Sequence, residues 1–278
     1  MITIPKFPLD KGVEAVIDFL SDNFAFITKA VAKVVESGLE SIVDGLMWLH
    51  PAVFILIAAL IAWRIAKWRM ALFTALGFAF IWNLQLWEPM LETLALVAVA
   101  TSIAVAIGVP LGIFSAMYQG IYRTVFPILD FMQTMPAFVY LIPAIPFFGL
   151  GTVSAIFSTV IFAMPPAIRL TCLGIKQVPA PLIEASDSFG ANRFQKLVKV
   201  QLPIATPTMM AGVNQTIMLS LSMVVIAAMI GAGGLGSEVW TGIQRLKPGM
   251  AFEGGLGVVI LAIVLDRLTQ KLGAKDKS

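Results

Sequence analysis

The pattern of hydrophobic positions divides the chain into an N-terminal amphipathic region and a series of long apolar stretches. Between residues 10 and 48, hydrophobic side chains from Val13 to Leu46 recur at helical spacing, and charged side chains fill the other faces. This periodicity is typical of an amphipathic helix that lies in a membrane interface or packs on partner helices. We expect a break near residues 21–23. Because the region is unusually acidic for lipid binding, we expect it to lie flat on the outer surface.

Seven apolar stretches follow, at residues 51–66, 70–87, 90–117, 125–149, 151–172, 204–231 and 250–267. Each predicts a membrane-spanning helix, because the bilayer interior satisfies no backbone polar group. The first is short, but Arg64 and Lys67 can extend to an interface. The fourth and fifth stretches are crowded by Pro127, Pro136, Pro143, Pro146, Pro165 and Pro166. These prolines indicate kinked helices, which either serve packing or line a pathway that opens and closes.

Composition supports an all-α integral membrane protein. Of 278 residues, 59% are hydrophobic and only 13% are charged, and the mean hydropathy is +0.91. A soluble domain is about half apolar and about a quarter charged. The net charge of +3 fits loops that face anionic lipid and cytoplasm better than a nucleic-acid partner.

A polar island, Glu184–Pro203, separates the fifth and sixth stretches, and the basic residues indicate its side of the membrane. If the island is cytoplasmic, thirteen of the 19 Lys and Arg residues lie inside and six outside. The inside set is then Arg64, Lys67, Arg69, Arg123, Arg169, Lys176, Arg193, Lys196, Lys199, Arg267, Lys271, Lys275 and Lys277. The positive-inside rule therefore predicts an outside N-terminus and a cytoplasmic C-terminus.

Several kinds of chemistry find no support in the sequence. The single cysteine, Cys172, excludes an internal disulfide and offers no metal cluster, and the single histidine, His50, is expected at an interface. The ionisable residues of the spans fall near span ends, at Glu92, Asp130, Arg169, Glu253 and Asp266. Ion-coupled carriers usually need such a group at the midplane, although sodium sites built from carbonyls escape this test. With no phosphate loop and no catalytic set, we expect a chain that is not an enzyme and does not itself hydrolyse ATP.

Gly231-Ala232-Gly233-Gly234-Leu235-Gly236 fits the dinucleotide-binding pattern G-x-G-x-x-G literally. That fingerprint requires a preceding strand and a following helix in a soluble βαβ unit. Here it follows a predicted membrane helix, so a glycine-rich helix terminus and tight turn at the outer mouth is the better interpretation.

The sixth stretch carries mid-span polar residues, and these are the candidates for lining a pathway: Asn214, Gln215, Thr216, Ser220 and Ser222. For any single one, interhelical hydrogen bonding, worth about 1 kcal/mol or less per contact, is slightly the better explanation. For the helix as a whole, a pathway for a polar solute is favoured.

The polar island has a fixed internal spacing: Glu-Ala-Ser, three residues, Gly, nine residues, then Val-Gln-Leu-Pro. It resembles the EAA loop of ABC importer permeases (EAA, three residues, G, nine residues, I-x-L-P), with Ser186 and Val200 as conservative departures. The matching positions are Glu184, Ala185, Ser186, Gly190, Val200, Leu202 and Pro203. Glycine permits a turn that other residues make only at a cost, and proline is tolerated at the first turn of the next helix.

The resemblance implies that this loop, within residues 177–203, binds in a groove of a cytoplasmic ATPase subunit, with Glu184 as polar anchor. ATP, bound by the partner and not by this chain, would then drive alternating access. Residues 90–269 resemble the five-helix core of a type I ABC importer permease. Residues 1–50 form the amphipathic region, residues 51–89 two extra spans and residues 270–278 a cytoplasmic tail.

Nearly the whole chain is similar to permeases of glycine betaine/proline (quaternary amine) uptake systems, most clearly in DFMQTMPAFVYLIPAIPFFGLG and in KVQLPIATPTMMAGVNQTIMLSLSMVVIAAMIGAGGLG. This resemblance implies a permease homodimer in the bacterial inner membrane, two ATPase subunits and an extracytoplasmic binding protein. Some relatives fuse the binding protein to the permease; the chain ends at Ser278 and we expect no such domain.

The solute is not specified by this sequence. In the family, the binding protein holds the quaternary ammonium group in an aromatic cage, a cation–π site. Betaine, choline, carnitine, proline betaine or a sulfonium analogue therefore remain open. The alternatives are an importer for another small polar solute, such as an amino acid or methionine, and a carrier or channel that acts alone.

Overall fold

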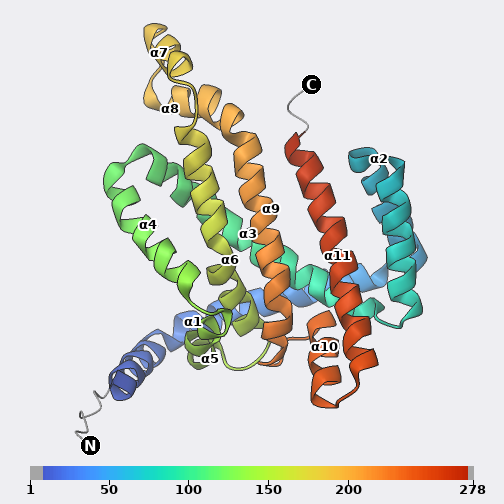
Figure 1. The fold of residues 1–278 in the computed structure, drawn as a ribbon. Coiled ribbons are helices and arrows are strands. Elements are labelled where there is room, and N and C mark those ends of the chain that lie inside the picture. The colour runs from blue at the N-terminus through green and yellow to red at the C-terminus, as the bar shows by residue number, and fades with distance from the viewer. Residues whose placement is uncertain (1–8, 275–278) are drawn as a thin grey trace, which may run out of the picture.

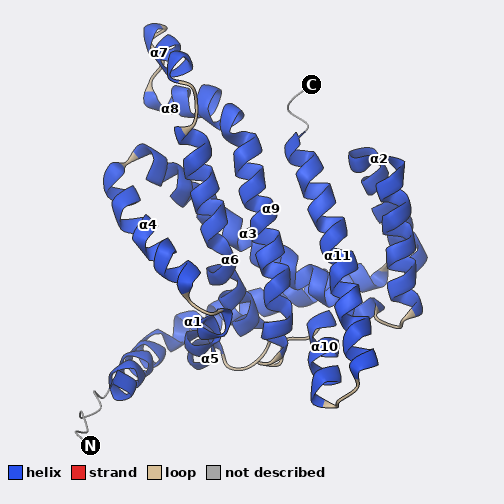
Figure 2. Cartoon of the chain, viewed as in Figure 1, coloured by secondary structure: helices blue, strands red, loops and turns tan. Residues whose placement is uncertain are grey.

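The chain folds into helices. The computed structural model of the protein describes residues 9–274, and every regular element in that range is helical (Figure 2). The elements are α1 (Leu9–Trp48), α2 (Pro51–Asn83), α3 (Trp87–Met117), α4 (Gln119–Thr134), η1 (Ala137–Tyr140), α5 (Leu141–Phe148), α6 (Thr152–Lys176), α7 (Ala180–Ser188), α8 (Arg193–Lys196), η2 (Leu197–Gln201), α9 (Leu202–Ala228), α10 (Leu235–Gln244) and α11 (Pro248–Ala274). The all-α class is confirmed. Of the expected tail, residues 275–278 lie outside the described range, as do residues 1–8 of the amphipathic region.

Five helices in the described range are long and apolar enough to cross a membrane: α2, α3, α6, α11 and the run Arg193–Ala228. A sixth span results if α4 and the segment Ala137–Phe148 count as one. That pair bends by 115° at Met135–Pro136, so the apolar stretch 125–149 is a sharply broken helix, in line with the kinks that its prolines indicate. Proline has no N–H to donate and the residue before it disfavours the helical region, which accounts for the break at this position.

The two expected spans at 51–66 and 70–87 both fall largely within α2. Helical geometry is interrupted at Ala66 and Lys67, where φ is −122° and 70°. Beyond this break the chain folds back on itself: the rings of Phe54 and Phe78 lie 6.0 Å apart, and those of His50 and Trp82 lie 5.9 Å apart. A straight helix would separate residues 24 positions apart by about 36 Å. Thus α2 is a helical hairpin whose two arms correspond to the two apolar stretches.

The core of the bundle is built by α3, α6 and α9. Leu91, Val97 and Leu221 are among its buried side chains. Small residues let the backbones approach: a Cβ added at Gly112 of α3 would lie 2.7 Å from the carbonyl oxygen of Ile168 in α6. Such close crossings are typical of membrane helices, because lipid is as apolar as a leucine side chain and the packing itself holds helices together.

The amphipathic region forms α1, which is continuous from Leu9 to Trp48. The expected break near residues 21–23 is therefore wrong, and the side chain of Asn23 instead donates to the carbonyl of Phe19, one turn back, at 2.7 Å. α1 contacts α3, α5 and α6. Val35, Leu39 and Leu46 pack against the core, so this helix covers one end of the bundle (Figure 1).

The glycine-rich segment 231–236 connects α9 to α10 and follows a helix, not a strand. Gly231 has φ 90°, and the amides of Gly231 and Ala232 donate to Ala228 and Ala227, which is the Schellman pattern of a helix terminus. The amide of Gly234 donates to the carboxylate of Glu92 in α3 at 2.6 Å. The helix-terminus interpretation of this motif is confirmed.

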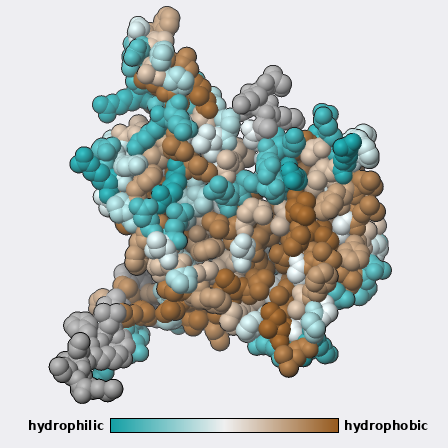
Figure 3. Space-filling model, viewed as in Figure 1, coloured by the Kyte–Doolittle hydropathy of each residue, from teal (hydrophilic) through white to brown (hydrophobic). Residues whose placement is uncertain are grey.

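The bundle has two distinct ends. α7 and α8 project at one end, where α11 also finishes, whereas α1, α5 and α10 lie at the other (Figure 1). On the face shown in Figure 3, a hydrophobic band runs across the middle of the molecule and hydrophilic residues gather toward the ends. This distribution fits a protein embedded in a bilayer.

Candidate coupling site at the helical tip

The polar island folds as a projecting hairpin of short helices, which we call the helical tip (Ala180–Gln201: α7, α8 and η2). It leaves the bundle after α6 and returns as α9 (Figure 1). The main contacts of α7 with other elements are those with α8 and η2. Most residues of α7 are exposed and none is buried, so the tip offers an accessible surface.

Gly190 makes the turn of the tip. Its φ is 74°, in the left-handed region that L-residues other than glycine adopt at a cost of about 1–2 kcal/mol. The amide of Gly190 donates to Asp187 at 2.9 Å and that of Ala191 donates to Ser186 at 3.0 Å, which is the Schellman motif. A Cβ at Gly190 would meet nothing within 4 Å. Glycine is therefore favoured at this position by the backbone conformation of the turn. A larger side chain would not collide with neighbouring atoms.

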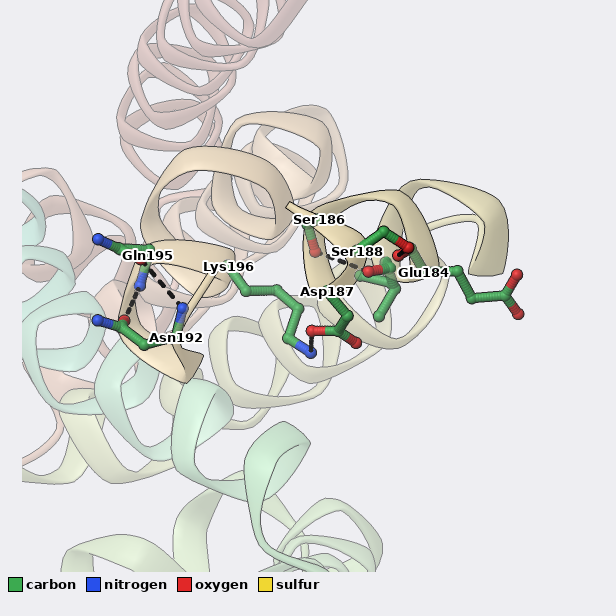
Figure 4. A network of polar contacts seen from close by, with 8 residues as sticks. Glu184, Ser186, Asp187, Ser188, Asn192, Gln195 and Lys196 are labelled. Atoms are coloured by element: carbon green, nitrogen blue, oxygen red, sulfur yellow. Dashed lines mark hydrogen bonds and ion pairs between the residues drawn. The ribbon is translucent and has the colours of Figure 1, made fainter. Parts of the chain in front are cut away.

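Three polar interactions fix the shape of the tip (Figure 4). The Asn192 side chain accepts from the Gln195 amide at 2.8 Å, and the Gln195 side chain accepts from the Asn192 amide at 3.0 Å. This capping box satisfies donors that the start of α8 would leave open. Lys196 Nζ lies 2.5 Å from Asp187 Oδ1 and links α8 to α7. The tip is therefore a preformed unit with its own internal contacts.

The outer face of the tip is unusual because large apolar side chains stand exposed on it. Phe189 is 92% exposed and Phe194 71% exposed. Glu184 and Ala185 of the same tip are also exposed, and Ser186 is half-buried. The Glu184 side chain extends away from the hydrogen-bonded network (Figure 4). Exposed aromatic residues next to a charged rim are typical of protein interfaces.

The base of the tip is anchored in the bundle. Leu197 is buried in a small cluster with Ile175 of α6 and Ala205 of α9, and Leu202 packs against that cluster. Val200 lies in the π-helical turn η2 and Pro203 in the first turn of α9. The base of the tip is therefore packed against α6 and α9, the two helices that it connects.

The five polar candidates on α9 divide into two groups. Thr216 and Ser220 are fully buried; Thr216 donates to the carbonyl of Gly212, and Ser220 accepts from Thr101 of α3 at 3.1 Å. Ser222 is exposed and donates to the carbonyl of Met218 in its own helix. Asn214 and Gln215 instead open into a groove of about 500 Å³ between α9 and α11.

Polar residues of α11 in and beside this groove make contacts that sequence reasoning missed. Asp266 of α11 accepts from Asn214 at 2.8 Å and from Gln270 at 2.6 Å, and Thr269 donates to Asn214. The hydrophobic pattern puts Asp266 at a span end, yet its carboxylate reaches a residue well inside α9. The sequence did contain a sign of this polar cluster. The spacing of Asp266, Thr269 and Gln270 places all three side chains on one face of the helix.

Residues 108–275 match the family model described as binding-protein-dependent transport system inner membrane component. The chain belongs to this family. Members are, by that description, the membrane components of transport systems that depend on a binding protein. The match covers α6, the helical tip, α9 and α11, and so includes both the tip and the groove.

Named relatives resemble the permease over its whole length. It is 49% identical over 278 residues to the glycine betaine transport system permease protein of Bacillus subtilis, covering 100% of this chain and 99% of the relative. It is 47% identical to the glycine betaine/carnitine transport permease protein of Listeria monocytogenes, covering 100% of both. Against the glycine betaine/proline betaine transport system permease protein of Escherichia coli, identity is 49% over 98% of this chain and 77% of the relative.

Among solved structures, the permease resembles the MetNI methionine ABC transporter in an inward-facing conformation. The TM-score is 0.63 at 25% sequence identity, over 69% of this chain and 96% of the other. The type I ABC importer permease fold expected from the EAA-like spacing is therefore confirmed.

Proposed function

We propose that this permease is the membrane subunit of an ATP-driven importer for glycine betaine and related quaternary ammonium solutes. The observation that carries the coupling part of this proposal is the preformed helical tip, which displays Glu184 and Phe189 to solvent at one end of the bundle. The solute class rests on the relatives, three of which are named for glycine betaine and are 47–49% identical.

The proposed partners rest on the same two observations, the preformed helical tip and the similarity to the named relatives. Two ATPase subunits bind the helical tips of a permease homodimer, and ATP is bound by them. An extracytoplasmic binding protein delivers the solute to the opposite end of the bundle. The tip is cytoplasmic, the N-terminus lies outside and the C-terminus inside, because the side with the tip carries the excess of Lys and Arg.

The groove between α9 and α11 forms part of the solute pathway. It combines the Asn214 and Gln215 amides with a neighbouring carboxylate, Asp266, and no ion pair to that carboxylate occurs among the described residues. Such a surface solvates a zwitterionic or cationic solute. Because transport requires release as well as entry, weak polar contacts suit this role better than a tight site.

The coupling role is tested with Phe189→Asp, which places a charge in the apolar part of the tip. We expect the variant to insert and fold normally but to lose co-purification with its ATPase and ATP-driven uptake. Leu246→Asp is the matched control, since Leu246 is 88% exposed at the α10–α11 turn, at the other end of the bundle. Unchanged ATPase association in Phe189→Asp would refute the assignment of the tip.

The solute is tested by uptake in a strain that lacks its own osmolyte transporters and expresses this permease with its ATPase and binding protein. We expect glycine betaine to restore growth at high salt. Uptake of methionine without uptake of betaine would refute the proposed solute class. It would not bear on the proposed coupling of the tip to the ATPase. Transport by the purified chain alone in vesicles would overturn both.

A further inference from the structure

A basic pocket lies between the turn of the α2 hairpin and the last turns of α11. It has a volume of about 240 Å³ and is lined by Ala66, Arg69, Met70, Arg267 and Lys271. Three cationic side chains from two separate helices therefore face one cavity. Arg69, Arg267 and Lys271 are exposed, and none of them takes part in the ion pairs found among the described residues.

The position of the pocket in the bundle is defined by α2. The open end of the hairpin, at His50 and Trp82, lies beside α3, so its turn at Ala66–Lys67 lies toward the end that carries the helical tip (Figure 1). The second arm packs closely on α11, since a Cβ at Gly77 would lie 2.7 Å from the Ile260 side chain. The pocket thus lies at the same end of the bundle as the helical tip, between the turn of the α2 hairpin and the last turns of α11.

The residue at the hairpin turn adds to the positive charge. Lys67 has φ 70°, a conformation that glycine adopts without strain and that costs other residues about 1–3 kcal/mol. Lysine is exposed at this position, one residue before Trp68 and two before Arg69. The hairpin turn therefore places a further exposed cation beside the pocket.

Exposed apolar side chains stand close in sequence to the residues that line the pocket. Trp68 is 62% exposed, Leu72 50% and Leu272 48%, and the Arg69 guanidinium lies 5.8 Å from the Trp68 ring. In Figure 3, hydrophilic residues at the upper ends of α2 and α11 stand directly above a hydrophobic band. Cationic side chains next to exposed apolar side chains are complementary to a lipid, whose anionic headgroup would contact the cations and whose hydrocarbon tails would contact the apolar side chains.

We propose that this pocket binds the headgroup of an anionic phospholipid, with the phosphate between Arg69 and Arg267 and the acyl chains along Trp68 and Leu72. Arginine suits phosphate because its planar fork donates two parallel hydrogen bonds. Basic pockets between membrane helices are a recognised mode of anionic lipid recognition. The site is separate from the helical tip and from the α9–α11 groove, and it depends neither on the ATPase nor on the solute.

The test measures retention of lipid by the full-length permease, purified with its partners from nanodiscs that contain phosphatidylglycerol and phosphatidylcholine in equal amounts. Native mass spectrometry reports which lipid stays bound. We expect wild type to retain phosphatidylglycerol at least tenfold over phosphatidylcholine. Each basic side chain near an anionic lipid contributes about fivefold in affinity, so Arg69→Gln/Arg267→Gln should lower phosphatidylglycerol affinity about 30-fold.

Two controls make the result specific. Arg69→Lys/Arg267→Lys keeps the charge and should retain most of the preference. Arg123→Gln/Lys176→Gln removes two exposed cations outside both the pocket and the helical tip and should retain all of it. Equal retention of both lipids by wild type, or equal loss in the Arg123→Gln/Lys176→Gln control, would overturn the proposal. Displacement of phosphatidylglycerol by equimolar inorganic phosphate would show a simple anion site and overturn the lipid assignment.

Discussion

The turn at Gly190 offers a quantitative test of how the helical tip is built. Because a Cβ at this position meets nothing within 4 Å, any substitution acts through backbone conformation and not through a clash. With φ at 74°, alanine should destabilise the Schellman turn by about 1–2 kcal/mol. That corresponds to about a 5- to 30-fold increase in the open population of the turn.

A graded series of variants separates conformation from size. Asparagine tolerates the left-handed region, so Gly190→Asn should lose less than Gly190→Ala despite its larger side chain. Gly190→Val should lose most, because a β-branched residue is a genuine outlier at positive φ. The expected order of function is therefore Gly, Asn, Ala and Val.

Hydrogen–deuterium exchange of the reconstituted complex provides the assay. Amides 189–191 should exchange faster in the order of the series, by about the 5- to 30-fold predicted for alanine, while α9 amides stay unchanged. ATP-driven uptake should fall in the same order. Activity that follows side-chain volume instead, with Asn below Ala, would refute the conformational argument.

Three further predictions concern other parts of the structure. Gly112→Ala would place a Cβ 2.6 Å from that of Thr171 and should lower the stability of the purified chain by about 1–3 kcal/mol in thermal unfolding; Gly255→Ala, with nothing within 4 Å, should not. Thr101→Val with Ser220→Ala should show a coupling energy of about 0.6 kcal/mol in a double-mutant cycle, and a value near zero would contradict the 3.1 Å hydrogen bond between the two side chains. Asn192→Ala removes the capping box and should weaken α8 by about 1 kcal/mol, seen as faster exchange of its first amides.

The elements that rest on long hydrophobic runs could be predicted from the sequence. The apolar stretches at 90–117, 151–172, 204–231 and 250–267 correspond to α3, α6, α9 and α11, because a bilayer leaves an apolar run of this length no alternative to a helix. The left-handed turn at Gly190 was also readable, because glycine occupies a fixed position in the pattern. The polar residues 21–23 were misleading, because α1 continues through them and the Asn23 side chain donates to the carbonyl of Phe19 in the same helix.

What could not be predicted depends on contacts between distant residues. Six prolines in two apolar stretches could each have marked a helix break. The 115° bend after α4 occurs at Pro136, whereas Pro165 and Pro166 lie inside the continuous helix α6. The reach of Asp266 to Asn214, 52 positions earlier, requires knowing that α9 and α11 are neighbours. The roles of the helical tip and groove residues remain predictions.

The position of α1 has a consequence for the biosynthesis of the permease. α1 is synthesised first, yet the surfaces that it covers belong to α3, α5 and the start of α6. About 100 residues must therefore be translated after Leu39 before Thr152 emerges, and at about 5–20 residues per second that takes about 5–20 s. During this interval the apolar face of α1 gains its contacts with α3 and α5 one after the other, and those with α6 last. The nascent helix must be shielded by lipid or by a chaperone until the rest of its binding surface exists.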